Sequence, residues 1–552
     1  MHLHDEVDQR LSDAIGPLFS GFDPRSVIST RPGVDRQYNG AMALAKAHRT
    51  TALDIAEDIV AKLRHDALFD SVSAEQPGFI NLRLSDAAII AAIEHCEMIT
   101  APPNERRRII LDYGGPNIAK ALHVGHLRSL VIGESLRQIL LARGHQVISD
   151  IHFGDWGMPM GMLIAELLHD YPGFPNQCPE NLSSLLERLY PESVETCARD
   201  PERMMEAHVV TAGLQMGELN WVWKIIREES LATMLPQIAR LGAHFDLLHG
   251  ESTAQPHIAP ALKLLSSYAR TDAGATVIDV TRPSDKKEIP PLIFQKGDGN
   301  YTYAATDLAT ILMRRLFPGT RKLTDRIIYV VDKRQSLHFE QVFRAARLMI
   351  DQVDLVHAGF GTVNGLDGRP FKSRDGGTPR LQDVLDTAVI TAIERMTDPD
   401  LAEIIGIGAI KFADLVTHRE SGYVFDLDRF LAPEGKTGPY VQYACVRLRR
   451  ILDAADDEPG PLLIELPVER DLLLTCTTFP EIVTLAENKL LPNYIAEYAF
   501  TLAQAVARFY QSCEVLNAEP PIRASRLAIC TVAHNVLRRS LALLGITVPE
   551  AM

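Results

Sequence analysis

The chain lacks long apolar stretches. No segment reaches the roughly 18 apolar residues that a helix needs to cross a bilayer, and the first residues, MHLHDEVDQR, are too polar for a secretion signal. Cysteine is scarce as well: the seven cysteines are an odd number and none forms a CxxC pair. This argues against a disulfide framework and a structural zinc site. These absences predict a protein of the reducing cytoplasm that has no membrane segment.

Basic residues are in deficit. The chain has 56 Lys and Arg against 71 Asp and Glu, a formal net charge of −15, which argues against a protein that coats nucleic acid without specificity. A local basic face stays open, since phosphate contacts act within one Debye length, roughly 10 Å. Internal repeats and low-complexity tracts are also missing, and a length of 552 residues suggests about three domains.

The patterns that are present divide the chain into three parts. Residues 1–99 alternate helical patterns with one strand-like piece, a Pro-rich linker follows at 100–105, and from about Glu434 the pattern is almost wholly helical. In between, a strand, a turn, a long helix and a second strand give the order of a parallel crossover unit. The predicted architecture is a small α+β head, a large α/β middle and a helical tail. The predicted strands are Gly78–Leu84, Arg108–Tyr113, His145–Asp150, Thr276–Val280 and Arg326–Val331, and the long helix runs from about Asn117 to Arg143.

Two histidines follow the first strand of the middle part. His123 and His126 are three residues apart, which places them on one helical face near the start of the long helix. Gly125 between them would let a flat ring approach the main chain, and a helix N-terminus after a parallel strand is a ready anion site. Two imidazoles there can donate hydrogen bonds to phosphate oxygens. An HxGH string alone also fits two surface histidines, but its position after a strand and a Pro-Asn turn favours nucleotide chemistry.

The segments around this turn resemble the signature of class I arginyl-tRNA synthetases. The likeness runs in family order along essentially the whole chain, and this collinearity is more specific than any one motif. The segments that carry it are Asp112–Lys120, His123–Ser129, His152–Gly157, Phe245–Asp246, Gly250–Ser252, Asp298–Asp307, Val331–Gln335 with His338–Phe339, Phe371–Gly376 and Leu544–Met552.

The resemblance implies a multidomain α/β protein. Residues 1–105 would form an α+β domain that contacts the tRNA elbow. Residues 106–435 would form a class I, Rossmann-like parallel-sheet catalytic domain with an insertion and a stem-contact region, and 436–552 an all-α anticodon-binding bundle. The activity implied is that of a cytoplasmic, monomeric ligase that joins L-arginine to tRNA(Arg). Arginine would attack ATP to give arginyl-adenylate, which passes to the terminal ribose 2′-OH, and Mg²⁺ would arrive bound to the nucleotide.

An arginine pocket needs carboxylates and flat polar groups, because arginine presents a planar fork of donors. Tyr303 and Asp307 are four apart in a helical pattern and share a face. By the resemblance, Glu251 and Asp307 hold the guanidinium and Tyr303 walls the pocket, while Asn117 and Gln335 grip the amino and carboxylate ends. Lysine, a point cation, should fit such a fork poorly. Each carboxylate taken singly also fits a solvated surface charge.

The resemblance also assigns a nucleotide site and a mobile loop. The class signature KMSKS corresponds here to Phe371–Asp375, followed by two glycines that suit a loop closing over ATP. Lys372 and Arg374 carry its charge, with Arg374 in place of the usual second lysine. Lys120, one turn before His123 on the same expected face, would supply the missing charge, although it also fits a solvated helix lysine. The ATP contacts implied are His123, Gly125, His126, His338, Phe371 and Ser373.

Two stretches depart from the family pattern beside the pocket. Gly114 and Gly115 stand where small hydroxyl residues or alanine are usual, and Met158-Pro159 replaces Thr-Gln. These departures leave open an altered affinity or rate, and a specialised duplicate of the enzyme.

The two ends carry the predicted RNA contacts. In the tail, two tyrosines could stack unpaired anticodon bases and two arginines could meet phosphates or base edges, although the pattern also fits an amphipathic helix with buried tyrosines. Further positions match family contacts near the anticodon and in the nucleotide-contacting stretch of the head. The residues concerned are Tyr440, Tyr443, Arg447 and Arg450, then Tyr510 and Met552, and in the head Gln37 and Asn39.

Two other interpretations compete. An HxGH nucleotidyltransferase that makes a small adenylated product would have no helical RNA-binding tail, and this chain has one. A non-catalytic or specialised synthetase paralogue that binds RNA would tolerate the loss of site residues, and His123, His126, Glu251 and Asp307 are all present. Pyrophosphate exchange with arginine, with and without tRNA, separates these hypotheses.

Overall fold

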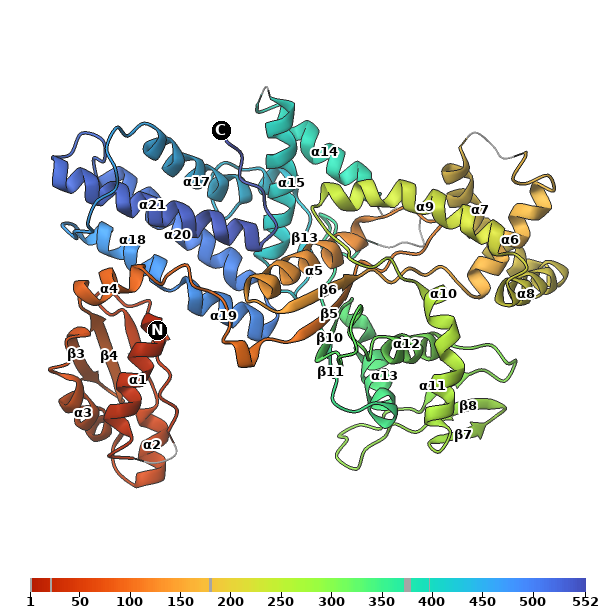
Figure 1. The fold of residues 1–552 in the computed structure, drawn as a ribbon, viewed down its shortest axis with the longest axis horizontal. Helices are drawn as coiled ribbons and strands as arrows, with labels where there is room; N and C mark the ends of the chain where they lie inside the picture. Colours follow the sequence, from red (N-terminus) through yellow and green to blue (C-terminus); the bar gives the residue numbers. More distant parts are fainter. Residues whose placement is uncertain (1, 20–21, 178–180, 372–378, 397) are drawn as a thin grey trace.

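The computed structural model describes residues 2–19, 22–177, 181–371, 379–396 and 398–552. A small α+β domain, a parallel-sheet domain with insertions and a helical bundle follow one another along the chain (Figure 1). Among the described helices, none combines the length and the apolar character needed to cross a membrane.

The N-terminal domain is an antiparallel sheet covered by helices, with strand order β1-β2-β4-β3. Helix α3 illustrates how the sequence produces this arrangement. Ile55, Ile59 and Leu63 recur every four residues and are all buried against the sheet. The Thr51 side chain caps the first turn of the helix. The elements are α1 (Leu3–Ile15), β1 (Val27–Ile28), β2 (Arg36–Tyr38), α2 (Ala41–His48), α3 (Ala52–Leu63), β3 (Phe69–Glu75), β4 (Phe79–Leu84), α4 (Asp86–Ile93) and the linker turn η1 (Pro103–Glu105).

The central sheet is wholly parallel, with strand order β11-β10-β5-β6. Strand β5 is covered on both faces, since Ile109 and Leu111 pack in one apolar cluster with α5 and Ile110 in another with α13. The chain runs from β5 toward β6 on one side and from β10 toward β11 on the other. This reversal opens a crevice at the carboxyl ends of β5 and β10. The elements are β5 (Arg108–Tyr113), α5 (Val124–Ala142), β6 (Gln146–Asp150), α12 (Tyr303–Met313), β10 (Arg326–Val330), η3 (Lys333–Gln335), α13 (Ser336–Met349) and β11 (Asp354–His357).

Two insertions extend this domain between β6 and α12. The first is helical, and the second joins short helices to a small antiparallel sheet ordered β7-β8-β9. The elements are α6 (Met158–Asp170), α7 (Leu182–Arg199), α8 (Pro201–Met216), α9 (Asn220–Arg240), α10 (Glu251–Ala254), η2 (Gln255–His257), α11 (Ile258–Leu265), β7 (Ala269–Asp272), β8 (Ala275–Ile278) and β9 (Leu292–Gln295).

The rest of the chain is mainly helical, and helices α17 to α21 form the bundle (Figure 1). Their buried faces carry apolar residues at helical spacing, as in Leu502, Val506 and Phe509 of α20. The elements are β12 (Val363–Asn364), α14 (Leu381–Ile393), α15 (Pro399–Leu415), β13 (Tyr423–Val424), α16 (Leu427–Phe430), α17 (Gly438–Asp453), α18 (Pro467–Thr477), α19 (Phe479–Lys489), α20 (Asn493–Ser512) and α21 (Pro520–Leu543).

The predicted long helix begins later than expected. Helix α5 starts at Val124, seven residues after Asn117. The intervening turn cannot be helical, because Ala119 has a φ of 61° and Asn117 forms an isolated bridge with Gly154. The predicted strands all exist: the ends of β5 match the prediction, and the other predicted strands differ by one or two residues at one or both ends. The other described strands, β1, β2, β3, β7, β9, β11, β12 and β13, were not predicted.

Ion pairs fix the N-terminal domain to the bundle. Arg470 of α18 contacts Asp35 and Asp86 at 2.8 Å each, and Arg36 of β2 binds Glu481 of α19 at 2.8 Å. Both arginines are buried, so loss of a carboxylate would leave a charge without compensation. These pairs hold the two ends of the chain together.

Candidate active site

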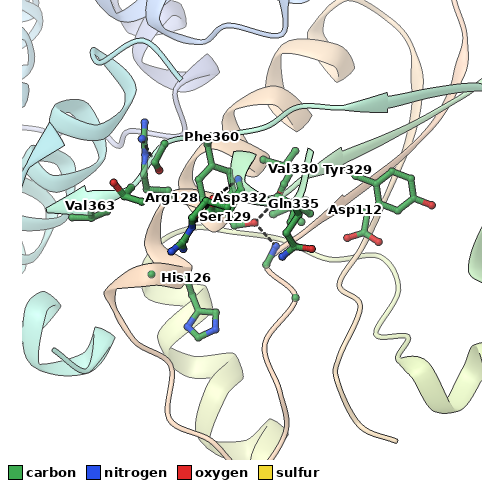
Figure 2. Close-up of a pocket in the computed structure, with 18 of the residues that line it drawn as sticks. Asp112, His126, Arg128, Ser129, Tyr329, Val330, Asp332, Gln335, Phe360 and Val363 are labelled. Atoms are coloured by element: carbon green, nitrogen blue, oxygen red, sulfur yellow. Dashed lines mark hydrogen bonds and ion pairs between the residues drawn. The ribbon is translucent and has the colours of Figure 1, made fainter. Parts of the chain in front are cut away.

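A cavity of about 860 Å³ opens at the carboxyl ends of β5 and β10. Its walls come from β5 and the turn after it, the start of α5, the end of β10 and residues 360–363 (Figure 2). This volume lies within the range of about 300–1,000 Å³ typical of small-molecule sites. Its lining includes Asp112, His123, Gly125, His126, His152, Asp307, Gln335 and Phe371.

The first turns of α5 hold the cavity wall together. Ser129 Oγ accepts from the Gly114 N–H and donates to the Val330 carbonyl, both at 2.8 Å, and so joins β5 to β10 (Figure 2). The neighbouring Arg128 is fully buried and pairs with Asp414 at 3.1 Å. Helix α5 is therefore locked against both sides of the crevice.

The side chains of the two predicted histidines both cap the start of α5. His123 is the N-cap residue and His126 the third residue of the helix. The His123 N–H donates to Nδ1 of His126, and the Gly125 N–H donates to Nδ1 of His123, each at 3.0 Å. A ring nitrogen that accepts carries no proton, so the proton of each neutral ring lies on Nε2. With ring centroids 4.0 Å apart, two Nε2–H donors stand side by side at the cavity wall.

Burial keeps both imidazoles neutral. It lowers the pKa of His126 to about 3; burial, and then the Lys120 ammonium, lowers the pKa of His123. Each ring is therefore an uncharged donor at neutral pH. Gly125 is needed for a contact within the motif, because a Cβ there would lie 2.7 Å from Cε1 of His123. The ring that approaches Gly125 in the structure is therefore the imidazole of His123.

A smaller cavity of about 250 Å³ adjoins the first one. It brings together four of the predicted arginine contacts, although they come from three separate segments of the chain. The two cavities share His152, Asp307 and Gln335, so they meet at these side chains. The smaller cavity is lined by His152, Glu251, Tyr303, Thr306, Asp307, Gln335 and His338.

Glu251 is set among other carboxylates. It is the first residue of α10, and Asp155 behind it is fixed by the N–H and Oγ of Ser252 at 2.9 and 2.8 Å. Burial, and then the charges of Asp155 and Asp307, raise the pKa of Glu251 to about 8. A cation that entered this cavity would favour the ionised carboxylate, so the electrostatics suit a cationic ligand.

His338 is not among the residues that line the larger cavity, so its contact with ATP stays a prediction. It lines the smaller cavity, where its Nε2 meets Oδ2 of Asp307 at 2.5 Å. Its neighbour Phe339 and nearby Gln335 line the larger cavity. The turn of α13 therefore directs His338 toward the acidic side chains.

Lys120 does not share a helical face with His123. It lies in the turn before α5, with its Nζ 4.0 Å from the ring centre of Tyr190 in α7. The expectation of a common face was wrong because the chain is not yet helical at this point. Its ammonium still lowers the pKa of both histidines, so its contribution of charge remains a prediction.

Of the remaining predicted contacts, some lie in the described part of the chain and others lie outside it. Asn117, in the turn after β5, lies outside the lining of both cavities. Phe371 lines the larger cavity, whereas Lys372, Ser373 and Arg374 lie outside the described residues.

The two departures from the family pattern lie in different surroundings. Gly114 and Gly115 have φ values of 92° and 55°, a conformation that glycine adopts without strain, and both line the larger cavity. Met158 and Pro159 begin α6 and lie outside both linings. Met158 packs instead with Ala165 and Ala207 between α6 and α8.

A buried ionic cluster beneath the site escaped the sequence analysis. Arg314 contacts Asp112 at 2.6 Å and Asp150 at 2.8 Å, and all three side chains are buried. The sequence analysis assigned no role to Arg314. The signal available in the sequence was that Asp112 and Asp150 lie within the last two residues of two strands of the parallel unit, which places two carboxylates at one sheet edge.

Some of the predicted RNA-contacting side chains of the bundle are exposed, whereas others are engaged in contacts within the protein. The Arg447 guanidinium lies 4.6 Å from the ring centre of Tyr443 and 4.4 Å from that of Tyr510, and both rings are exposed. Tyr440 instead packs against Phe500 in the bundle. Arg450 donates to the Met552 carbonyl, so it anchors the C-terminal residue.

In the N-terminal domain, the predicted contacts lie on and beside β2. Gln37 of β2 donates from Nε2 to Oδ1 of Asn81 on the adjacent strand β4, at 2.8 Å. Asn39 is exposed at the end of β2.

A parallel sheet with paired imidazoles at a helix start, beside a nucleotide-sized cavity, is the arrangement of a class I aminoacyl-tRNA synthetase, and the family model named next assigns the chain to that class. Residues 89–427 match the family model "tRNA synthetases class I (R), catalytic domain", residues 441–552 "DALR anticodon binding domain" and residues 1–84 "Arginyl tRNA synthetase N terminal domain". The "Arginine--tRNA ligase" of Maricaulis maris is 38% identical over 99% of this chain and 100% of its own. The chain belongs to the arginyl-tRNA synthetase family.

Other relatives agree. The protein of the same name from Alkaliphilus oremlandii is 38% identical over 95% of both chains. The arginyl-tRNA synthetase structure of Thermus thermophilus superposes with a TM-score of 0.81 at 25% identity, covering 100% of both chains. That of Plasmodium falciparum gives 0.83 at 24% identity, over 100% of this chain and 99% of the other, and shows the same fold.

Proposed function

We propose that the protein joins L-arginine to tRNA(Arg) with ATP, through an arginyl-adenylate. The observation that carries the proposal is the meeting of two cavities at His152, Asp307 and Gln335: the larger one carries the two uncharged imidazole donors, and the smaller one is acidic. This arrangement suits a reaction between a nucleotide and a cationic amino acid. The same features favour a catalyst over a paralogue that only binds RNA.

Arginine would lie with its guanidinium in the smaller cavity. Glu251 and Asp307 would receive the donor fork, and Tyr303, which stands at the same cavity, would cover it. Gln335 lines both cavities and would hold the carboxylate near the nucleotide. Asn117 is the proposed partner of the amino group.

Activation breaks one phosphoanhydride bond. A carboxylate oxygen of arginine attacks the α-phosphorus of ATP, the bond to the bridging oxygen breaks, and pyrophosphate leaves. The Nε2–H groups of His123 and His126 would donate to phosphate oxygens on which negative charge grows. Because both rings are already fixed by their caps, they need no reorganisation during the step. The terminal ribose 2′-OH then attacks the adenylate carbonyl carbon, and AMP leaves.

Further charge would come from Lys120 and from Lys372, Arg374 and Ser373 of the loop beside Phe371. Magnesium would be bound by the triphosphate as part of the substrate, with water as its other ligands. In the part of the chain that the structure describes, no group of three or more His, Cys, Asp or Glu is arranged to hold a metal ion.

We also propose domain limits of 1–105, 106–435 and 436–552, for an enzyme that acts in the cytoplasm as a monomer. The first domain would bind the tRNA elbow through Gln37 and Asn39. The last would bind the anticodon loop through Tyr443 and Arg447. Tyr440, Arg450 and Met552 are the other proposed contacts there, and they would act mainly by shaping the surface, since each is engaged within the protein.

The test is aminoacylation of total tRNA with each of the twenty standard amino acids. We expect charging with arginine alone, and loss of it in Asp307→Asn. The exposed Arg315→Ala is the control. Charging with another amino acid, or undiminished activity of Asp307→Asn, would refute the proposal. Pyrophosphate exchange with arginine, with and without tRNA, shows whether activation itself needs the RNA.

A further inference from the structure

We infer that His338 is a positioning residue of the amino-acid pocket, which holds Asp307 for the guanidinium of arginine. This role rests on the proposed function and adds to it a determinant of amino-acid affinity. It also separates His338 from the nucleotide site.

The contact is direct and joins two helices. Nε2 of His338, the third residue of α13, lies 2.5 Å from Oδ2 of Asp307 in the middle of α12. Asp307 lines both cavities, but His338 lines the smaller one. The imidazole therefore approaches the carboxylate from the side of the arginine pocket.

This hydrogen bond can fix the direction of the carboxylate. A guanidinium fork needs acceptor oxygens at set positions in one plane, and a freely rotating carboxylate would lose that geometry. With Oδ2 engaged by His338, rotation about the side-chain bonds is restricted and Oδ1 is left for the substrate. The hydrogen bond to Asp307 also raises the pKa of His338, as expected for a charge-assisted contact.

The inference predicts which kinetic constant changes. A residue that orients Asp307 affects the KM for arginine, whereas a nucleotide contact affects the KM for ATP. Removing a hydrogen bond to a charged group typically costs roughly 10- to 100-fold in affinity. A substitution that keeps a donor at similar reach should recover most of this loss.

The experiment compares His338→Gln, which keeps a donor, with His338→Phe, which keeps a ring but no donor. Leu337→Ala, at an exposed neighbour on α13, controls for disturbance of the helix. For the full-length protein with tRNA(Arg), we expect His338→Phe to raise the KM for arginine about 10-fold or more. Its KM for ATP should change less than about twofold, and His338→Gln should lie near the wild type. Circular dichroism checks the fold, and His338→Leu replaces the Phe variant if that one does not fold.

A second measurement asks whether His338 acts through Asp307. In the Asp307→Asn background, His338→Phe should weaken arginine binding, measured by equilibrium dialysis, no further than Asp307→Asn alone.

A rise confined to the KM for ATP, equal defects in the Gln and Phe variants, or full additivity with Asp307→Asn would overturn the inference. A wild-type protein that charges no arginine would instead refute the proposed function, so the two failures are distinct.

Discussion

The main-chain N–H of His123 donates to Nδ1 of His126 at 3.0 Å, so the side chain that caps α5 is also a proposed phosphate donor. His126 therefore has a structural role, as a helix cap, and a proposed catalytic role, as a phosphate donor. A suitable substitution can separate the two roles.

His126→Ala should lower pyrophosphate exchange by about 100- to 1,000-fold, because a preorganised donor to the developing charge is lost. It should also destabilise the start of α5 by about 1 kcal/mol through loss of the cap. His126→Gln provides the control, since glutamine in this position can accept from the N-cap N–H. We expect the melting temperature of His126→Gln to stay near that of the wild type while exchange remains low. A wild-type rate in either variant would contradict the assigned role.

The raised pKa of Glu251, about 8 in the empty pocket, predicts a pH dependence of arginine affinity. Below this pKa the carboxyl group is protonated, so a guanidinium must displace a proton to bind. The KM for arginine should therefore fall as pH rises toward 8, by up to about tenfold per unit, and then level off. Aminoacylation between about pH 6.5 and 9 measures it. Glu251→Gln should bind arginine more weakly at high pH and lose this dependence; an unchanged dependence in this variant would assign it to another group.

The buried cluster of Arg314 predicts a large effect on stability. Arg314→Leu leaves Asp112 and Asp150 buried without their partner, which should cost about 3–5 kcal/mol. Arg315→Leu, at the exposed next position, should change stability by less than about 0.5 kcal/mol. Because a chain of several domains does not unfold in one step, the comparison uses the shift of the first thermal transition. Equal shifts for both variants would show that the ion pairs do not stabilise the sheet edge.

The Arg447 guanidinium between Tyr443 and Tyr510 predicts a change confined to tRNA binding. Arg447→Ala should raise the KM for tRNA(Arg) about tenfold, as a lost stacking contact does, with the KM values for arginine and ATP unchanged. Arg447→Lys should not restore affinity, because an ammonium lacks the planar face. Arg449→Ala, on the same helix and paired with Asp453, is the control. A wild-type KM for tRNA in Arg447→Ala would exclude this surface as the anticodon contact.

The sequence alone determined the features that depend on neighbours along the chain. Strand β5 was predicted with its observed ends, because an apolar run bounded by a Pro-rich linker and a Gly-Gly-Pro turn has few alternatives. The helical character of the C-terminal part followed from periodicity. Collinear motifs indicated the family, and Tyr303 and Asp307 were placed on one helix from their spacing.

Tertiary structure decided which distant segments meet. Glu251, Asp307 and His338 come from three helices, and no local pattern states that His338 faces Asp307 rather than a nucleotide. The same holds for Arg314, whose burial depends on two carboxylates from separate strands. The turn that carries Lys120 departs from its helical pattern because Ala119 adopts a positive φ as the chain crosses the sheet edge. Sequence periodicity indicates which residues share a face of a helix or strand. The partner of a charged side chain, in contrast, is decided by how distant segments pack across the whole domain.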